Sequence, residues 1–305
     1  MIKRTKLILT SLLLSSTLCA VETTLTNISF VQDEEGNLNP YIFIPFYYGA
    51  SNQFYSAVGY TSGTTSNTDV IEEGLDSKYS SVVSRKDLTI NYFTYVIPLS
   101  MATLSVGVGS LFTQAENNEF GYIDLAGTYN SIENRVNLDA QIHYIELQVM
   151  IPLGNYVNSR ISTTLSPYTV LQVENKTTFK PSVTEEGVSN SSKVQDISYT
   201  ASLELQTNLD FFANFGFTAS YSHQPVKYDT IAVNSTLDAF EPLHIDTNEV
   251  RTKYLAKVIF DLELLGGLNP SIGYGIEYLD TKNNITGSRD SSSSDIFTLG
   301  IEKRF

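Results

Sequence analysis

The clearest candidate chemistry in this chain is a row of cations on one face of a predicted strand. Arg251, Lys253 and Lys257 occupy odd positions, and the even positions of the same segment are mainly apolar: Tyr254, Ala256, Val258 and Phe260. Because successive side chains of a strand point to opposite faces, the cations share one face and the apolar residues share the other. A cation on the lipid face of a membrane-spanning strand costs about 2–4 kcal/mol at the midplane, so we expect these cations to face an interior. A row of cations there is the chemistry of a pore lining that selects anionic solutes.

Acidic residues on other predicted strands support a second interpretation of the same row. The phase predicted to point inward on those strands holds four carboxylates and one imidazole: Glu277, Glu204, Glu174, Asp139 and His143. Together with the three cations, these residues are the candidate lumen lining. Carboxylates beside the cations would instead fill a narrow lumen with salt bridges. The sequence leaves both interpretations open, because about ten to twelve strands lie between small filled barrels and the open porins of about sixteen or more.

No pattern in the sequence predicts catalysis or metal binding. The three histidines, His143, His223 and His244, lack the spacing of a metal site, and no nucleophile elbow or Gly-rich phosphate loop is present. A phospholipase site on the lipid face needs a His and a Ser close together, and the predicted phase turns His143 inward. We therefore expect no enzyme, no cofactor and no metal ion. The net charge of -14 excludes nucleic-acid binding, because phosphate contacts need a basic surface.

Long amphipathic strands are the elements that would position these residues. Segments 101–112 and 195–209 alternate apolar with small or polar residues over a length that suits a tilted membrane crossing, which needs about nine to eleven residues. The predicted strands are 25–31, 41–48, 54–60, 88–97, 101–112, 138–151, 161–173, 195–209, 213–221, 250–262, 272–279 and 295–305. Within 138–151 the apolar phase changes after Tyr144, which predicts a β-bulge there. Pro45 weakens the prediction of a strand at 41–48.

Connections between the predicted strands alternate between tight and long. The tight turns are 98–101, 152–158, 210–212 and 265–270, and the predicted long loops are 62–84, 113–137, 175–194, 226–249 and 280–294. Short periplasmic turns and long external loops are the rule in outer-membrane barrels. Many of the acidic residues fall in the long loops, where they would gather cations or simply keep the surface soluble.

The two ends of the chain carry export and assembly features. Residues 1–20 have a basic start, a short apolar run and a small residue, Ala20, which predict a cleaved signal peptide, so that 21–305 is the mature domain. The final strand places Phe297, Leu299, Ile301 and Phe305 on one face. This ending resembles the closing strand of Gram-negative outer-membrane β-barrel proteins, in which a terminal Phe belongs to the signal read by the barrel-assembly machinery. The resemblance implies an outer-membrane location, with membrane lipid and lipopolysaccharide as partners.

These observations predict an all-β protein, a transmembrane antiparallel up-and-down β-barrel. Twelve strands are favoured and ten are the alternative, depending on whether 25–31 and 41–48 form a hairpin. The expected function is a narrow channel or uptake pore for small solutes. The alternative is a closed structural or surface-interaction barrel with acidic external loops. An autotransporter-like translocator and a barrel enzyme rank below both.

Overall fold

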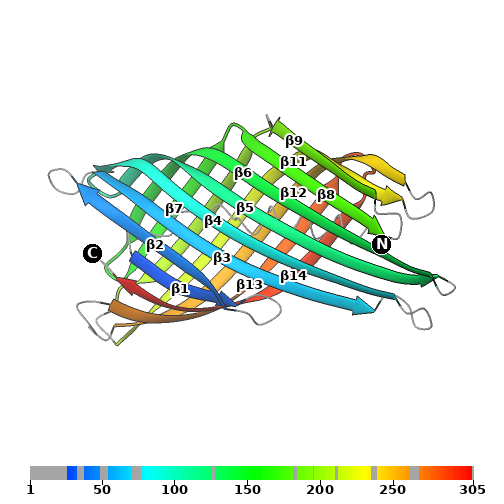
Figure 1. The fold of residues 1–305 in the computed structure, drawn as a ribbon. Coiled ribbons are helices and arrows are strands. Elements are labelled where there is room, and N and C mark those ends of the chain that lie inside the picture. The colour runs from blue at the N-terminus through cyan, green and yellow to red at the C-terminus, as the bar shows by residue number, and fades with distance from the viewer. Residues whose placement is uncertain are drawn as a thin grey trace.

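The chain folds into antiparallel strands that wind round a common axis (Figure 1). The structure is a computed structural model that describes ten stretches of the chain: 26–32, 38–48, 54–70, 77–125, 128–180, 184–194, 196–209, 212–234, 239–261 and 268–303. The predicted signal peptide and Phe305 lie outside these residues. No helix in the described stretches is long and apolar enough to cross a membrane.

Fourteen strand segments make up the wall. In chain order they are β1 (Thr26–Gln32), β2 (Leu38–Tyr48), β3 (Phe54–Val70), β4 (Ser77–Pro98), β5 (Thr103–Leu125), β6 (Thr128–Leu153), β7 (Val157–Ser166), β8 (Thr169–Lys180), β9 (Thr184–Val194), β10 (Ser198–Thr207), β11 (Ala213–Asn234), β12 (Ala239–Phe260), β13 (Leu268–Asn283) and β14 (Arg289–Lys303).

The segments form twelve strands in a closed barrel, which confirms the favoured prediction. β14 pairs with β1, and β5 pairs with β6, so each of the twelve strands pairs with both of its neighbours over at least part of its length. β7 and β8 follow one another along the same edge of β6, and β9 and β10 do the same along β8 and β7. Each of these two pairs is therefore one strand with a break in it.

The breaks in these two strands lie at the same height. Between Leu165 and Thr169 the strand carries one residue more than the facing part of β6. Between Val194 and Ser198 the next strand likewise carries one residue more than the stretch that faces it. An extra residue in one strand interrupts the ladder and bends the strand. Both strands therefore change direction at this height.

The predicted long loops were wrong, because most of their residues continue the strands. β5 runs to Leu125 and β6 starts at Thr128, so the segment predicted as the loop 113–137 is mainly a hairpin. β3 and β4, β8 and β9, β11 and β12, and β13 and β14 likewise continue far into the segments predicted as loops. The tight turns at 98–101 and 152–158 are confirmed: the N–H of Leu99 donates to the carbonyl of Ala102, and Gly154 has a positive φ of 73°.

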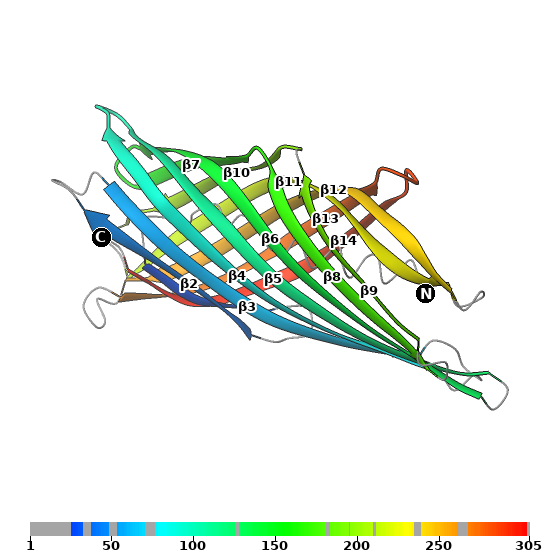
Figure 2. The same ribbon diagram turned by 45° about the horizontal axis from the view of Figure 1, so that its top comes forward.

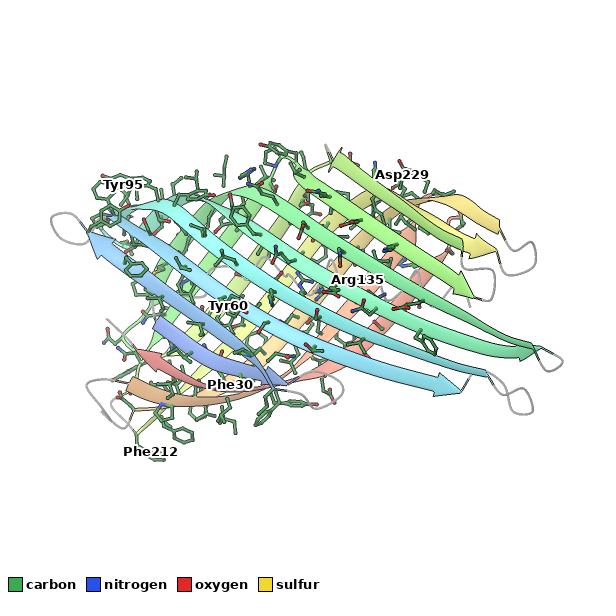
Figure 3. The ribbon with its side chains drawn as sticks, in the orientation of Figure 1. Phe30, Tyr60, Tyr95, Arg135, Phe212 and Asp229 are labelled. Carbon is green, nitrogen blue, oxygen red and sulfur yellow. The ribbon has the colours of Figure 1, made fainter. Side chains whose placement is uncertain are left out.

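The strands of the hairpins are longer than a membrane crossing needs: β6 has 26 residues, whereas about nine to eleven suffice. Figure 2 shows the long strands running out together beyond one end of the barrel. Figure 3 shows Tyr95 and Phe212 near the end with the tight turns and Asp229 at the opposite end. We call the end with tight turns the membrane tier and the hairpin extensions the outer tier. On β6 the boundary lies between Tyr144 and Ile145. Up to Tyr144 the apolar side chains are on the buried inner face, and from Ile145 onward they are on the exposed outer face, so the apolar and polar residues exchange faces there.

The closing strand behaves as its sequence predicts. Phe297, Leu299 and Ile301 of β14 are exposed on the outer face, and Gly300 is buried on the inner face. β1 pairs with β14 through Thr26–Gln32, so 25–31 supplies the partner strand that the twelve-stranded prediction required. Pro45 pairs with Ala57 on β3 and lies two residues beyond Phe43, where the described ladder between β2 and β1 ends.

Candidate functional site: the barrel interior

The membrane tier has a polar inner face and an apolar outer face. On β5, Ser105 is buried inside while Val106 and Val108 are exposed outside. On β10, Thr200 and Glu204 are buried while Tyr199 and Leu203 are exposed. A bilayer accepts the apolar outer face, and the polar inner face is left to line the lumen.

One group of ionised residues on this inner face joins three strands. Arg160 on β7 donates from Nη1 to Oε2 of Glu204 on β10 at 2.9 Å. The Nζ of Lys257 on β12 lies 4.0 Å from the other oxygen of the same carboxylate, Oε1. The side chains of Glu204 and Lys257 are each only 7% exposed. One buried carboxylate thus neutralises two cations that come from strands on either side of it.

A glycine on β11 makes this contact across the wall possible. Gly216 is the ladder partner of Lys257, and a Cβ placed on Gly216 would lie 2.7 Å from Cγ and 2.9 Å from Cε of Lys257. The aliphatic stem of Lys257 therefore lies flat over Gly216 on its way to Glu204. Any larger residue at 216 would compete with the stem for the same space.

The second ionised group joins β12 to β13. The Nη1 of Arg251 lies 2.5 Å from Oε1 of Glu277, and the side chain of Glu277 retains 17% exposure. Lys253 is the ladder partner of Glu277 and lies on the same inner face, partly exposed. The five predicted lining residues on β10, β12 and β13 are thus brought together on one side of the interior: Glu204, Arg251, Lys253, Lys257 and Glu277.

The other three predicted lining residues point the opposite way. Asp139 and Glu174 are exposed on the outer face, and His143 is half-buried on that face. The register between β5 and β6 runs without a shift from Thr128 to Met150, so the β-bulge predicted in 138–151 does not exist. β4 instead carries an extra residue: its register shifts between Asn91 and Phe93 against β5, and between Tyr55 and Ala57 of β3 against β4. The apolar residues of β6 above the boundary face inward because this part of the strand stands outside the lipid.

His143 forms a hydrogen bond on the outer face that the inward prediction excluded. Its Nδ1 lies 2.6 Å from Oγ of Ser110, the ladder partner of His143 on β5, and its ring meets the edge of Tyr168 with ring centroids 5.8 Å apart. This brings a Ser and a His together at the outer boundary of the lipid-facing belt. Ser110 is completely buried, so its hydroxyl has no open approach for a substrate and serves to hold the imidazole in place.

The interior of the outer tier contains an apolar core that the sequence prediction missed. It is built by inward side chains of β5, β6, β8, β11 and β12: Ala115, Val136, Leu138, Ala140, Leu171, Val173, Val226, Tyr228 and Ile245. All of them are at most 6% exposed. The alternation of these apolar residues with polar ones is visible in the sequence. The rule that apolar residues face lipid assigned them to the outer face, whereas they lie on the inner face.

Buried polar residues on the β4, β5 and β6 side also escaped the sequence prediction. Asn91 donates from Nδ2 to Oε2 of Glu146 at 3.4 Å, and both side chains are almost fully buried. Arg85 and Asp87 form a buried ion pair, with Nε of Arg85 2.8 Å from Oδ2 of Asp87. Across the described residues, no group of three or more His, Cys, Asp or Glu is placed to hold a metal ion.

Comparison with solved structures supports the fold. The chain is similar to the translocator domain of the autotransporter NalP from Neisseria meningitidis, with a TM-score of 0.51, 13% identity and coverage of 99% of this chain and 97% of that one. The Pseudomonas putida toluene transporter TodX aligns with a TM-score of 0.46, 10% identity and coverage of 92% of this chain and 87% of that one. The KdgM porin aligns with a TM-score of 0.38, 8% identity and coverage of 92% of this chain and 99% of that one. No protein-family model and no curated protein matches the sequence. The likeness to the NalP translocator domain supports the fold of an outer-membrane β-barrel, and identities this low carry no further argument.

Proposed function

We propose that this chain is a narrow channel of the outer membrane for small solutes, with its bore set by the two ionised groups in the membrane tier. The observation that supports the proposal is the pairing of Glu204 with Arg160 and Lys257, together with the Arg251–Glu277 pair on the same inner face. The cations are largely neutralised where they stand, so a solute would meet alternating charge instead of the purely basic strip expected from the sequence. Export by a cleaved signal peptide, with insertion by the barrel-assembly machinery beside lipopolysaccharide, belongs to the same proposal.

Conductance across a planar lipid bilayer tests the channel. Purified protein should give single-channel steps, and replacing Glu204 by Gln should shift the reversal potential in a salt gradient toward anion selectivity, because it leaves two cations on the lining. Asp139→Asn is the matched control, since Asp139 is exposed on the outer face and should leave selectivity unchanged. A bilayer that shows no steps for either the native protein or Glu204→Gln would exclude the channel.

The apolar core of the outer tier favours a second candidate function, a closed barrel whose external hairpins bind a partner. Val226, Tyr228 and Ile245 pack with apolar side chains of β6 and β8 inside the barrel and fill the interior beside those strands. Shortening the β3–β4 hairpin should then alter partner binding or envelope integrity while permeability stays the same. Single-channel steps from the intact protein would count against this second function.

A further inference from the structure

One carboxyl group inside the barrel is buried without a hydrogen bond. Glu249 on β12 is 1% exposed, and neither of its carboxylate oxygens accepts a hydrogen bond from the described residues. Its ladder partners, Gln224 on β11 and Thr281 on β13, are neutral. A buried charge that is neither paired nor hydrogen-bonded costs far more than a buried neutral group. The surroundings of Glu249 therefore favour its protonated form.

Glu249 lies between the two tiers. The ladder row of Ile145, the first membrane-tier residue of β6, reaches Val250 on β12 by way of β7, β10 and β11. Glu249 is one residue to the outer-tier side of this row. Ile245, a member of the apolar core, lies four residues farther out on the same inner face. The carboxyl group is thus placed between the apolar core and the ionised lining.

Two arginines act on this carboxyl group, and each already holds another carboxylate. Arg251 lies 2.5 Å from Glu277, and Arg85 on β4 lies 2.8 Å from Asp87. Both arginines attract Glu249 electrostatically, but neither donates a hydrogen bond to it. A negative charge on Glu249 would therefore be neutralised only in part.

Arg85 and Glu249 come from opposite walls of the barrel. In the ring of twelve strands, β4 and β12 are six strands apart in either direction. Both side chains are buried, and each acts electrostatically on the other across the interior. Side chains of the two walls therefore approach each other at this height, and a solute can pass them only if they move apart.

Burial raises the pKa of Glu249 well above its usual range, and the attraction of Arg251 and Arg85 offsets only part of this rise. If the walls moved apart, water would reach the carboxyl group and its pKa would fall toward the usual Glu value of about 4.3. The closed state then binds the proton more tightly than the open state. By linkage, low pH stabilises the closed state and a rise in pH favours the open one.

Other charged groups face the same part of the interior. The two acids among them each have an arginine partner, whereas Glu249 accepts no hydrogen bond, so we assign the change of charge to Glu249. β5 and β11 contribute neutral side chains at this height. On the described strands β12, β13 and β4 the charged groups are Arg251, Lys253, Glu277, Arg85 and Asp87.

We propose that Glu249 is a proton switch that keeps the bore closed while its carboxyl group is protonated and lets the bore open when that group ionises. The charged form is too costly within the closed packing, so it draws in water and separates the side chains of β4 from those of β12. This inference rests on the proposed channel and adds the group that controls its opening.

Single-channel recording at several pH values tests the switch. The open probability of the native protein should rise several-fold from about pH 5 to about pH 9, a range that starts near the usual Glu value. Glu249→Gln, which imitates the protonated group, should stay mostly closed over the whole range. Glu174→Gln is the matched control, because Glu174 is exposed on the outer face of β8 and its loss should leave the native pH response intact.

An open probability of the native protein that does not change with pH would overturn the switch and leave the channel standing. The same holds for a pH response of Glu249→Gln equal to the native one. If neither protein gives steps at any pH, the channel fails and the switch fails with it.

Urea unfolding in detergent micelles checks the titration of Glu249 without any conductance. Because the folded pKa is the higher one, the native protein should lose stability relative to Glu249→Gln as the pH rises through the folded value. An equal pH dependence of the unfolding midpoint in both proteins would overturn the assignment to Glu249. If Glu249→Gln does not form the heat-modifiable folded barrel on gels, Glu249→Met, which is neutral and of similar length, takes its place in both experiments.

Discussion

Lys257 reaches Glu204 only by lying across the glycine that pairs with it on the intervening strand. The Nζ of Lys257 is 4.0 Å from Oε1 of Glu204, and Gly216 between them has no side chain to obstruct the stem. A contact between strands that are not neighbours thus depends on the absence of one Cβ.

Gly216→Val tests this dependence. The new side chain would overlap the stem of Lys257, so we expect overpacking to cost about 1–3 kcal/mol of stability and Lys257 to leave Glu204. Urea unfolding in detergent micelles, followed by gel mobility, measures the stability. Gly59→Ala is the control, because a Cβ there makes only ordinary contacts at 3.4 Å. Equal stability of both variants would show that the stem does not cross Gly216.

Glu204→Gln tests how far Glu204 stabilises the interior. The variant leaves Arg160 and Lys257 in a buried environment without a charged partner, and removing one member of a buried pair costs about 3–5 kcal/mol. The same unfolding assay should show a much smaller effect for Asp280→Asn, which breaks an exposed pair in the outer tier. If the two variants lose similar stability, the interior around Glu204 is hydrated.

Cysteine labelling tests the phase of β6. In a Cys19→Ser background, Asp139→Cys should react with a membrane-impermeant maleimide added to folded protein, because Asp139 is exposed on the outer face. Leu138→Cys should remain unlabelled until the protein is unfolded, because Leu138 is 2% exposed in the outer-tier core. The reverse pattern would restore the inward phase that the sequence predicted for Asp139.

The Asp280–Arg289 pair should make a small, pH-dependent contribution to stability. The hydrogen bond from Arg289 holds the pKa of Asp280 below its usual range. Since the folded pKa is the lower one, the contribution is complete above the usual Asp value of about 3.9 and is lost as the pH falls through the folded value.

Arg289→Gln should move the pKa of Asp280 upward, as followed by carboxyl NMR shifts in an acid titration. Lys282→Gln is the control, since Lys282 is the ladder partner of Arg289 and its loss should affect Asp280 much less. An unchanged Asp280 titration in Arg289→Gln would mean that the pair is absent in solution.

The sequence predicted the barrel because the membrane imposes one simple rule. Alternation of apolar and polar residues identified the strands and the tight turns at 98–101 and 152–158. In the structure Arg251 and Lys257 are buried on the inner face. The same rule failed on β6, where Leu138 and Ile142 are apolar because they form a core, while Ile145 and Leu147 are apolar because they face lipid. Alternation alone cannot distinguish these two causes, since both produce the same period.

The contacts between side chains of different strands could not be predicted from the sequence, for a different reason. Neither the pairing of Glu204 with two cations nor the hydrogen bond between Ser110 and His143 follows from the spacing of residues along one strand. Both depend on the register between strands, which turn lengths and bulges set. The break between Leu165 and Thr169 and the break between Val194 and Ser198 therefore had to be seen before Arg160 could be named as the partner of Glu204.

The exchange of faces at Tyr144 and Ile145 also fixes how deep the barrel sits. A strand rises about 3.3 Å per residue. If the whole barrel shifted by two residues along β6, the exchange point would therefore move by about 6.6 Å along that direction relative to the membrane. Sliding one way would place polar residues such as His143 and Gln141 against hydrocarbon, and sliding the other way would lift Ile145 and Leu147 into water. The boundary on β6 therefore determines how deeply the whole protein is inserted in the membrane.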